Sequence, residues 1–242
     1  MALPKNETPT FRGTVPSTKK RFEFRPFLVK EQKILLIALE SQDIEQMYIA
    51  FRDILKTCVL TPDAIDVEKS PAFDIESVFM QISAKSVGEQ SNILVHCNKC
   101  QESNEVKIET EHVYVKNFEE ASANTKIQLT DNLGIILKYP SLYDSITITT
   151  ANAKQKNSET QMIYDTIIAS LESVYDTDNV YPIEDQTKED VIEFIDSLTI
   201  DQMKKVEGFF ENIPYLAYDL EFTCSSCGHV NKQEIQGMKN FF

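Results

Sequence analysis

The sequence contains no tryptophan, only three histidines and only six glycines among its 242 residues. Few glycines leave few loops that can cradle a phosphate, and no nucleophile elbow or HExxH pair is present. The segment from Gly13 to Lys20 resembles a phosphate loop, but Thr18 occupies the place of the glycine before the lysine and no helix start follows. These absences predict a protein that is not an enzyme and has no small-molecule substrate.

Positive charge is also scarce. There are 24 lysines and arginines against 38 aspartates and glutamates, which gives a formal net charge of −14. Nucleic-acid affinity comes mainly from lysine and arginine contacts with phosphates, so we expect no nucleic-acid partner. No apolar run approaches the length of a membrane span, and residues 1–7 lack the apolar region of a signal peptide. We therefore expect synthesis in a reducing cytosol.

Four of the five cysteines form two CxxC pairs, Cys97 with Cys100 and Cys224 with Cys227. Alternating apolar residues flank each pair, as in two strands joined by a tight turn. They are Ile93, Val95, Val106, Ile108, Leu220, Phe222, Val230 and Ile235. Two such knuckles supply four thiolates, the closed ligand set of a structural zinc site. The alternative of two redox pairs lacks a thioredoxin-like βαβ context. We predict one structural Zn²⁺ per chain.

The spacing of the two pairs is unusual, because 123 residues (101–223) separate them, whereas ordinary zinc ribbons have about 15–20. A metal here joins two distant parts of the chain, which favours a structural clasp over a catalytic centre. His96 and His229 adjoin the pairs as alternative ligands, although a hydrogen bond to sulfur or exposure to solvent is the simpler interpretation. The fifth cysteine, Cys58, falls on the apolar face of a predicted helix and is expected in the core.

Residues 1–26 predict an N-terminal arm with a β-hairpin, whose strands at 10–15 and 21–25 flank a turn that begins at Pro16. An isolated hairpin gains stability from a neighbour, so we predict that it contacts a partner. The candidate partner-binding residues are Lys19, Lys20, Arg21, Phe22, Phe24, Arg25, Phe241 and Phe242. Two alternatives remain open: the hairpin caps its own domain, and the two terminal phenylalanines pack back onto the protein.

Residues 27–90 predict a helical region. A helix at 29–40 is apolar around most of its circumference, which predicts burial. A second helix at 44–58 has Asp43 as its cap. A third, at 74–86, has Asp74 as its cap and Gly88 as its stop signal.

Residues 91–242 predict a zinc-ribbon domain with strands at 105–115 and 133–139 and a helical insert at about 141–214. Within the insert, helix caps are predicted at Ser158, Thr187 and Thr199. Ile163, Ile167, Leu171 and Val174 follow the first of these caps at helical spacing. The acidic segment 175–186 lacks the spacing and glycine of a calcium loop and is expected to be a solvated loop.

Several stretches resemble the T4-type bacteriophage baseplate protein family, whose name-giving member is a baseplate hub subunit. The matching pieces are residues 25–33, 73–76, 84–89 and 138–141, the first cysteine pair, Phe209-Phe210 with Pro214 before the second pair, and Phe241-Phe242. The segment from Phe73 to Glu89 is the most specific, and the pieces cover nearly the whole chain. The resemblance implies a structural component of a contractile phage tail, located in the virion, with other baseplate and tail proteins as partners. It carries over no catalytic residues.

The sequence therefore predicts an α+β fold with a zinc-ribbon-like β core split between two knuckles, helices before and within the insert, and an N-terminal hairpin. The expected function is that of a zinc-clasped structural subunit of the baseplate, in the hub or an adjoining region. Two alternatives are a hub assembly chaperone that is absent from the finished virion and a zinc-ribbon module associated with nucleic acid.

Overall fold

The computed structural model describes residues 7–118, 125–155 and 158–237. The chain forms two compact units: residues 1–116 with 215–242 make the first, and residues 117–214 make the second. The domain boundaries suggested by the sequence after residues 26 and 90 both fall inside the first unit. Among the described helices, none combines the length and apolar character needed to cross a bilayer.

The N-terminal hairpin is confirmed in place but belongs to the core of the first unit. Strands β1 (Phe11–Thr14) and β2 (Arg21–Phe24) pair antiparallel. Phe22 and Phe24 are only 1% and 2% exposed. The prediction that these two rings bind a partner therefore needs correction, because the unit itself covers them.

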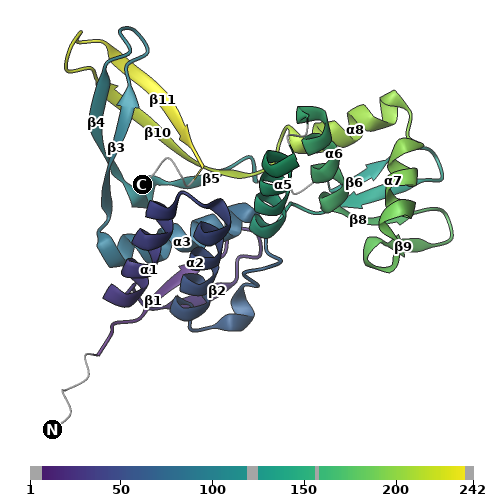
Figure 1. Ribbon diagram of the computed structural model, residues 1–242, viewed down its shortest axis with the longest axis horizontal. Coiled ribbons are helices and arrows are strands. Elements are labelled where there is room, and N and C mark those ends of the chain that lie inside the picture. The colour runs from purple at the N-terminus through teal and green to yellow at the C-terminus, as the bar shows by residue number, and fades with distance from the viewer. Residues whose placement is uncertain (1–6, 119–124, 156–157, 238–242) are drawn as a thin grey trace. The chain divides into compact units, whose positions relative to one another are not determined.

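The described residues of the first unit form three α-helices, α1, α2 and α3, which are labelled in Figure 1. Helix α1 spans Val29–Ser41, α2 spans Ile44–Cys58 and α3 spans Ala72–Val87. Asp43 caps α2 as expected, since its side chain accepts hydrogen bonds from the backbone N–H groups of Glu45 and Gln46. Gly88, at φ 117°, follows the last residue of α3.

Asp74 does not cap α3, contrary to the sequence prediction. The helix begins at Ala72, after Pro71, and Asp74 lies inside its first turn. Its buried carboxylate accepts hydrogen bonds from the backbone N–H (2.9 Å) and the hydroxyl of Ser17 in the turn of the hairpin. Gln81, further along α3, exchanges two hydrogen bonds with the backbone of Thr14. Helix α3 thus fixes the hairpin.

The prediction that α1 is buried is also wrong. Its exposed apolar side chains include Val29 (81%), Leu36 (52%) and Ile37 (54%). The helix instead buries Glu31, which pairs with Arg25 at 2.9 Å, and the small Ala38. The side of α1 that faces the core therefore carries Glu31 and Ala38, and most of the large apolar side chains of the helix are exposed.

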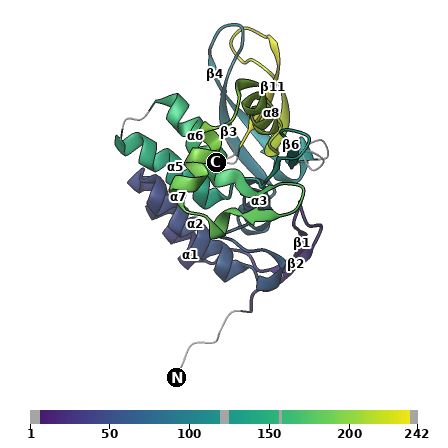
Figure 2. The same ribbon diagram turned by 90° about the vertical axis from the view of Figure 1, so that its right-hand side faces the viewer.

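Two long hairpins complete the first unit, and they lie side by side in Figures 1 and 2. Strands β3 (Gln90–His96) and β4 (Ser103–Glu109) pair in one. Strands β10 (Tyr215–Thr223) and β11 (Val230–Gln236) pair in the other. The strand expected at 105–115 is broken by a 3₁₀ turn at Thr110–His112, after which β5 (Tyr114–Lys116) pairs with β10.

The second unit is a small antiparallel sheet with helices. Its strands are β6 (Lys126–Gln128), β7 (Gly134–Leu137), β8 (Leu171–Tyr175) and β9 (Val180–Pro182), in that order across the sheet. Its helices are α5 (Leu142–Gln155), α6 (Glu159–Ser170), α7 (Lys188–Asp196) and α8 (Ile200–Phe210). The predicted caps Ser158, Thr187 and Thr199 all accept hydrogen bonds from their helices.

The apolar spacing after Ser158 does not continue as one helix. Ile167 lies in α6, whereas Leu171 and Val174 lie in β8. Both elements face the same core, in which Ile135, Ile167 and Leu171 are buried. The predicted helical insert is therefore a mixed α/β unit that begins before residue 141.

Candidate metal centre

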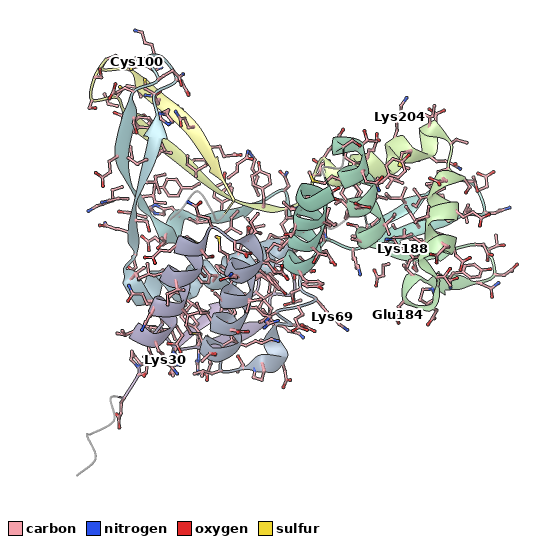
Figure 3. All side chains as sticks on the ribbon, viewed as in Figure 1. Lys30, Lys69, Cys100, Glu184, Lys188 and Lys204 are labelled. Carbon is pink, nitrogen blue, oxygen red and sulfur yellow. The ribbon has the colours of Figure 1, made fainter. Side chains whose placement is uncertain are left out.

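The tips of the two long hairpins bring the four paired cysteines together. Figure 3 shows Cys100 at this end of the first unit. The Sγ atoms of Cys97 and Cys227 are 3.7 Å apart, and those of Cys100 and Cys224 are 3.6 Å apart. All four Sγ atoms lie within 4.8 Å of one another. These distances far exceed the S–S bond of about 2.05 Å in a disulfide.

The geometry fits a tetrahedral metal ion. Four sulfurs at about 2.3 Å from one Zn²⁺ lie about 3.8 Å apart along each edge of the tetrahedron. The Cys97–Cys227 and Cys100–Cys224 Sγ separations approach this value and link opposite hairpins. Four thiolates also fill all positions of a structural site and leave none for a reacting water. The residues present can therefore hold a metal as a clasp between the hairpins.

Each knuckle is shaped by the same backbone turn. The N–H of Cys97 donates to the carbonyl of Glu102, and the N–H of Cys224 donates to the carbonyl of His229, both at 2.9 Å. Four residues after the first cysteine of each pair, Gln101 (φ 60°) and Gly228 (φ 68°) adopt left-handed backbone conformations. The two tips are thus repeats of one local structure.

Two buried asparagines cross between the knuckles, and sequence reasoning missed them. Asn104 accepts hydrogen bonds from the N–H and hydroxyl of Ser225 (2.9 and 3.0 Å) and donates to the sulfur of Cys224 (3.7 Å). In the reverse direction, Asn231 accepts from the N–H of Asn98 (2.8 Å) and donates to the sulfur of Cys97 (3.5 Å).

A signal for this arrangement exists in the sequence. Asn104 and Asn231 each stand seven residues after the first cysteine of their pair. The repeat of this interval would have indicated related roles before the structure was known. Its meaning, a hydrogen bond to the opposite knuckle, depends on the hairpins being side by side.

Hydrogen bonds lower the pKa of the first thiol in each CxxC pair. Burial opposes ionisation of Cys97, but hydrogen bonds from the backbone N–H groups of Cys100 and Lys99 and from Asn231 lower the pKa of its thiol to about 6. Backbone N–H groups of the second knuckle, led by that of Cys227, likewise lower the pKa of Cys224. These donors stabilise negative charge on sulfur, which is the form that binds a metal ion.

The alternative ligands and the fifth cysteine lie outside this group. The four cysteines form the cluster without a histidine among the described residues. The imidazole of His96 lies 3.3 Å from the carbonyl oxygen of Gln101, and both His96 and His229 are exposed. Cys58 is buried in α2, as predicted, and burial raises the pKa of its thiol to about 11.

The candidate partner-binding residues are distributed unevenly. Lys19, Lys20 and Arg21 are exposed at the turn of the hairpin. Arg25 is largely buried and ion-paired with Glu31, so its charge is already neutralised within the unit. Phe241 and Phe242 lie outside the described residues.

Comparison with known proteins gives one match. The family model described as T4 bacteriophage base plate protein matches residues 8–242, which is nearly the whole chain. No curated protein and no solved structure matches.

Proposed function

Because the chain belongs to the T4 bacteriophage base plate protein family, we propose that it is a non-catalytic structural subunit of a contractile tail baseplate, in the hub or an adjoining region. One Zn²⁺ clasps its two long hairpins. The observation that carries the clasp is the set of four Sγ atoms within 4.8 Å, drawn from segments more than 120 residues apart. Such a site stabilises the folded state and leaves no position for catalysis.

Metal content tests the clasp. We expect one zinc per purified chain, measured by atomic emission against protein concentration. Cys97→Ser or Cys224→Ser should lose the metal and unfold the hairpins. Cys58→Ala is the matched control, because it removes a cysteine from the same unit and should keep the metal. A wild-type protein that is metal-free and fully stable would refute the clasp.

The exposed basic turn is the proposed contact with another tail protein. Lys19, Lys20 and Arg21 project from a hairpin that α3 holds in place, so the chain presents them in a fixed geometry. An acidic surface is the complementary partner. Acidic surface is available on such proteins: the second unit of this chain, residues 117–214, contains 18 acidic and seven basic residues.

Substitutions in the basic turn test this contact better than deletion of the hairpin does. Deleting the hairpin would remove the buried Phe22 and Phe24 and unfold the unit, so loss of assembly would not be informative. Reversing Lys19, Lys20 and Arg21 to glutamate leaves both rings in place. We expect this variant to keep its zinc but to enter tail particles poorly. Normal incorporation would refute the contact.

Mass spectrometry of purified phage particles tests the structural role itself. A baseplate subunit is found at a fixed copy number in each particle. If the chain is present during assembly but absent from finished particles, it is an assembly chaperone and the structural proposal fails.

A further inference from the structure

The proposed function does not use the exposed outer face of α1. A helix turns about 100° per residue. Val29, Lys33, Leu36, Ile37 and Glu40 therefore lie on the side opposite to the buried pair of Glu31 and Ala38. All five are exposed. We refer to these five residues as the α1 face.

The apolar side chains of the α1 face, Val29, Leu36 and Ile37, are unfavourable in contact with water. Burial of such side chains is favourable, and contiguous exposed apolar patches mark interaction sites. Ile34 and Leu39, 48% and 44% exposed, border the α1 face on its two sides. The α1 face thus combines three apolar residues with Lys33 and Glu40, and one further apolar residue lies along each of its sides.

The charges on the α1 face are arranged in a self-complementary order. Lys33 lies in the N-terminal half and Glu40 lies in the C-terminal half, two turns further on and on the same side. The chain continues this order outside the face. Lys30 precedes Lys33, and the exposed Asp43 follows Glu40.

Two antiparallel copies of such a helix match each other. A two-fold axis that passes between Leu36 and Ile37, in the C-terminal half of α1, places Leu36 of one copy opposite Ile37 of the other. In the same register, Lys33 comes opposite Glu40, and this pair occurs twice. An unrelated apolar partner would not require a basic and an acidic residue at equal distances on the two sides of one axis.

We propose that the α1 face is a docking surface for a second copy of this chain, formed by antiparallel pairing of α1 with α1. A 13-residue helix is about 20 Å long and offers less than the roughly 800 Å² per partner of a standard interface. The dimer is therefore weak in solution, with a Kd of about 1–100 µM, and is reinforced where copies are concentrated in an assembly.

Sedimentation equilibrium of the full chain with bound metal, at about 1–300 µM protein, tests the pairing. Wild-type protein should show a reversible monomer–dimer equilibrium. Lys33→Glu places like charges opposite each other at both ends of the pair, and so does Glu40→Lys. Each should raise the Kd about tenfold. The double variant Lys33→Glu/Glu40→Lys reverses both partners and should return the Kd to about the wild-type value.

Two further variants separate a specific pairing from general stickiness. Ile37→Asp, at the centre of the α1 face, should abolish the dimer. Leu94→Asp, at a 75% exposed apolar position on β3, and Lys69→Glu, a charge reversal in the same unit, should leave it unchanged. Zinc content and thermal unfolding show whether each variant is folded.

Any of three results would overturn the proposal. They are a monomeric wild type over the whole range, a dimer that Ile37→Asp does not weaken, and a double variant no tighter than the single variants. In those cases the α1 face is covered by the rest of this chain or by a different tail protein. None of these results bears on the zinc clasp, which metal analysis tests separately.

Discussion

Asn104 and Asn231 form reciprocal hydrogen bonds across the cysteine cluster. Each belongs to one hairpin and donates to the sulfur of the first cysteine of the other hairpin. The side-chain oxygen of each also accepts a backbone N–H from the opposite knuckle. The two hairpins are therefore joined by hydrogen bonds in addition to the proposed Zn²⁺. The asparagines orient the ligands and support negative charge on sulfur.

Asn104→Ala should weaken zinc binding by about 10–100-fold, the usual effect of removing a group that orients a metal ligand. Competition with a chromophoric chelator measures this. Asn92→Ala is the control, since Asn92 is exposed on the same hairpin. Equal affinities for the two variants would show that the crossed hydrogen bonds do not support the metal.

Arg25 and Glu31 form the most buried ion pair among the described residues, with side chains 13% and 4% exposed. Burial opposes ionisation of Glu31, but the hydrogen bond and charge of Arg25 and the backbone N–H of Leu28 lower its pKa below the ordinary value. Removing Arg25 leaves a buried carboxylate without its cation. Arg25→Gln should therefore cost about 3 kcal/mol of unfolding free energy, measured by denaturant titration.

Arg21→Gln provides the contrast, because Arg21 is exposed at the start of β2, the strand that ends just before Arg25. It should change the unfolding free energy by less than about 0.5 kcal/mol. If the two variants are equally stable, Arg25 is not a structural residue and returns as a candidate for partner binding.

Asp74 shows that an acidic residue near a helix start can serve another element. Its carboxylate holds the backbone N–H and hydroxyl of Ser17. Asp74→Ala leaves that N–H without its acceptor. It should lower the free energy of unfolding, measured by thermal unfolding, by about 2 kcal/mol. Ser17→Ala keeps the backbone hydrogen bond and should cost less, about 1 kcal/mol. The reverse order would contradict the anchoring of the hairpin by α3.

Local signals in the sequence were sufficient where a few neighbouring residues determine the structure. The hairpin around Pro16, the caps at Asp43 and Thr187, the capping box at Thr199 and the stop at Gly88 all appear as expected. The convergence of the two CxxC pairs was predicted across 123 residues because the chemistry of a tetrahedral thiolate site requires four ligands.

The sequence predictions were wrong where tertiary contacts determine the burial or the type of an element. The apolar content of α1 predicted burial, but the pairing of Glu31 with Arg25 turned that side of the helix inward. Leu171 and Val174 fit a helical spacing, yet Leu171 pairs with Leu137 and Val174 with Ile135 as part of a sheet. Neither the ion pair nor the strand register is visible in a local window of sequence.

Glu76 makes the stability of the protein depend on pH near neutrality. Burial in α3 raises the pKa of its carboxyl from 4.5 to about 7. The folded state therefore binds a proton that the unfolded state has released, so stability linked to Glu76 is complete below about pH 4.5 and is lost as pH rises through about 7. Glu76→Gln stays neutral at every pH and should be more stable than wild type at pH 8, by about 1–3 kcal/mol after allowance for partial exposure.

Denaturant titrations at pH 5, 6, 7 and 8 give the unfolding free energies of Glu76→Gln and wild type. Their difference removes the pH dependence of the cysteine cluster, which both proteins share. The advantage of Glu76→Gln should grow as pH rises from 5 to 8. The pKa shift of Glu68 has the opposite sign, because the hydrogen bond and charge of Lys56 lower the pKa of its carboxyl. Its stabilisation is present above about pH 4.5 and is lost as pH falls below that value, so the difference between Glu68→Gln and wild type should stay nearly constant from pH 5 to 8. A pH-independent difference for Glu76→Gln would show that the Glu76 carboxyl is solvated.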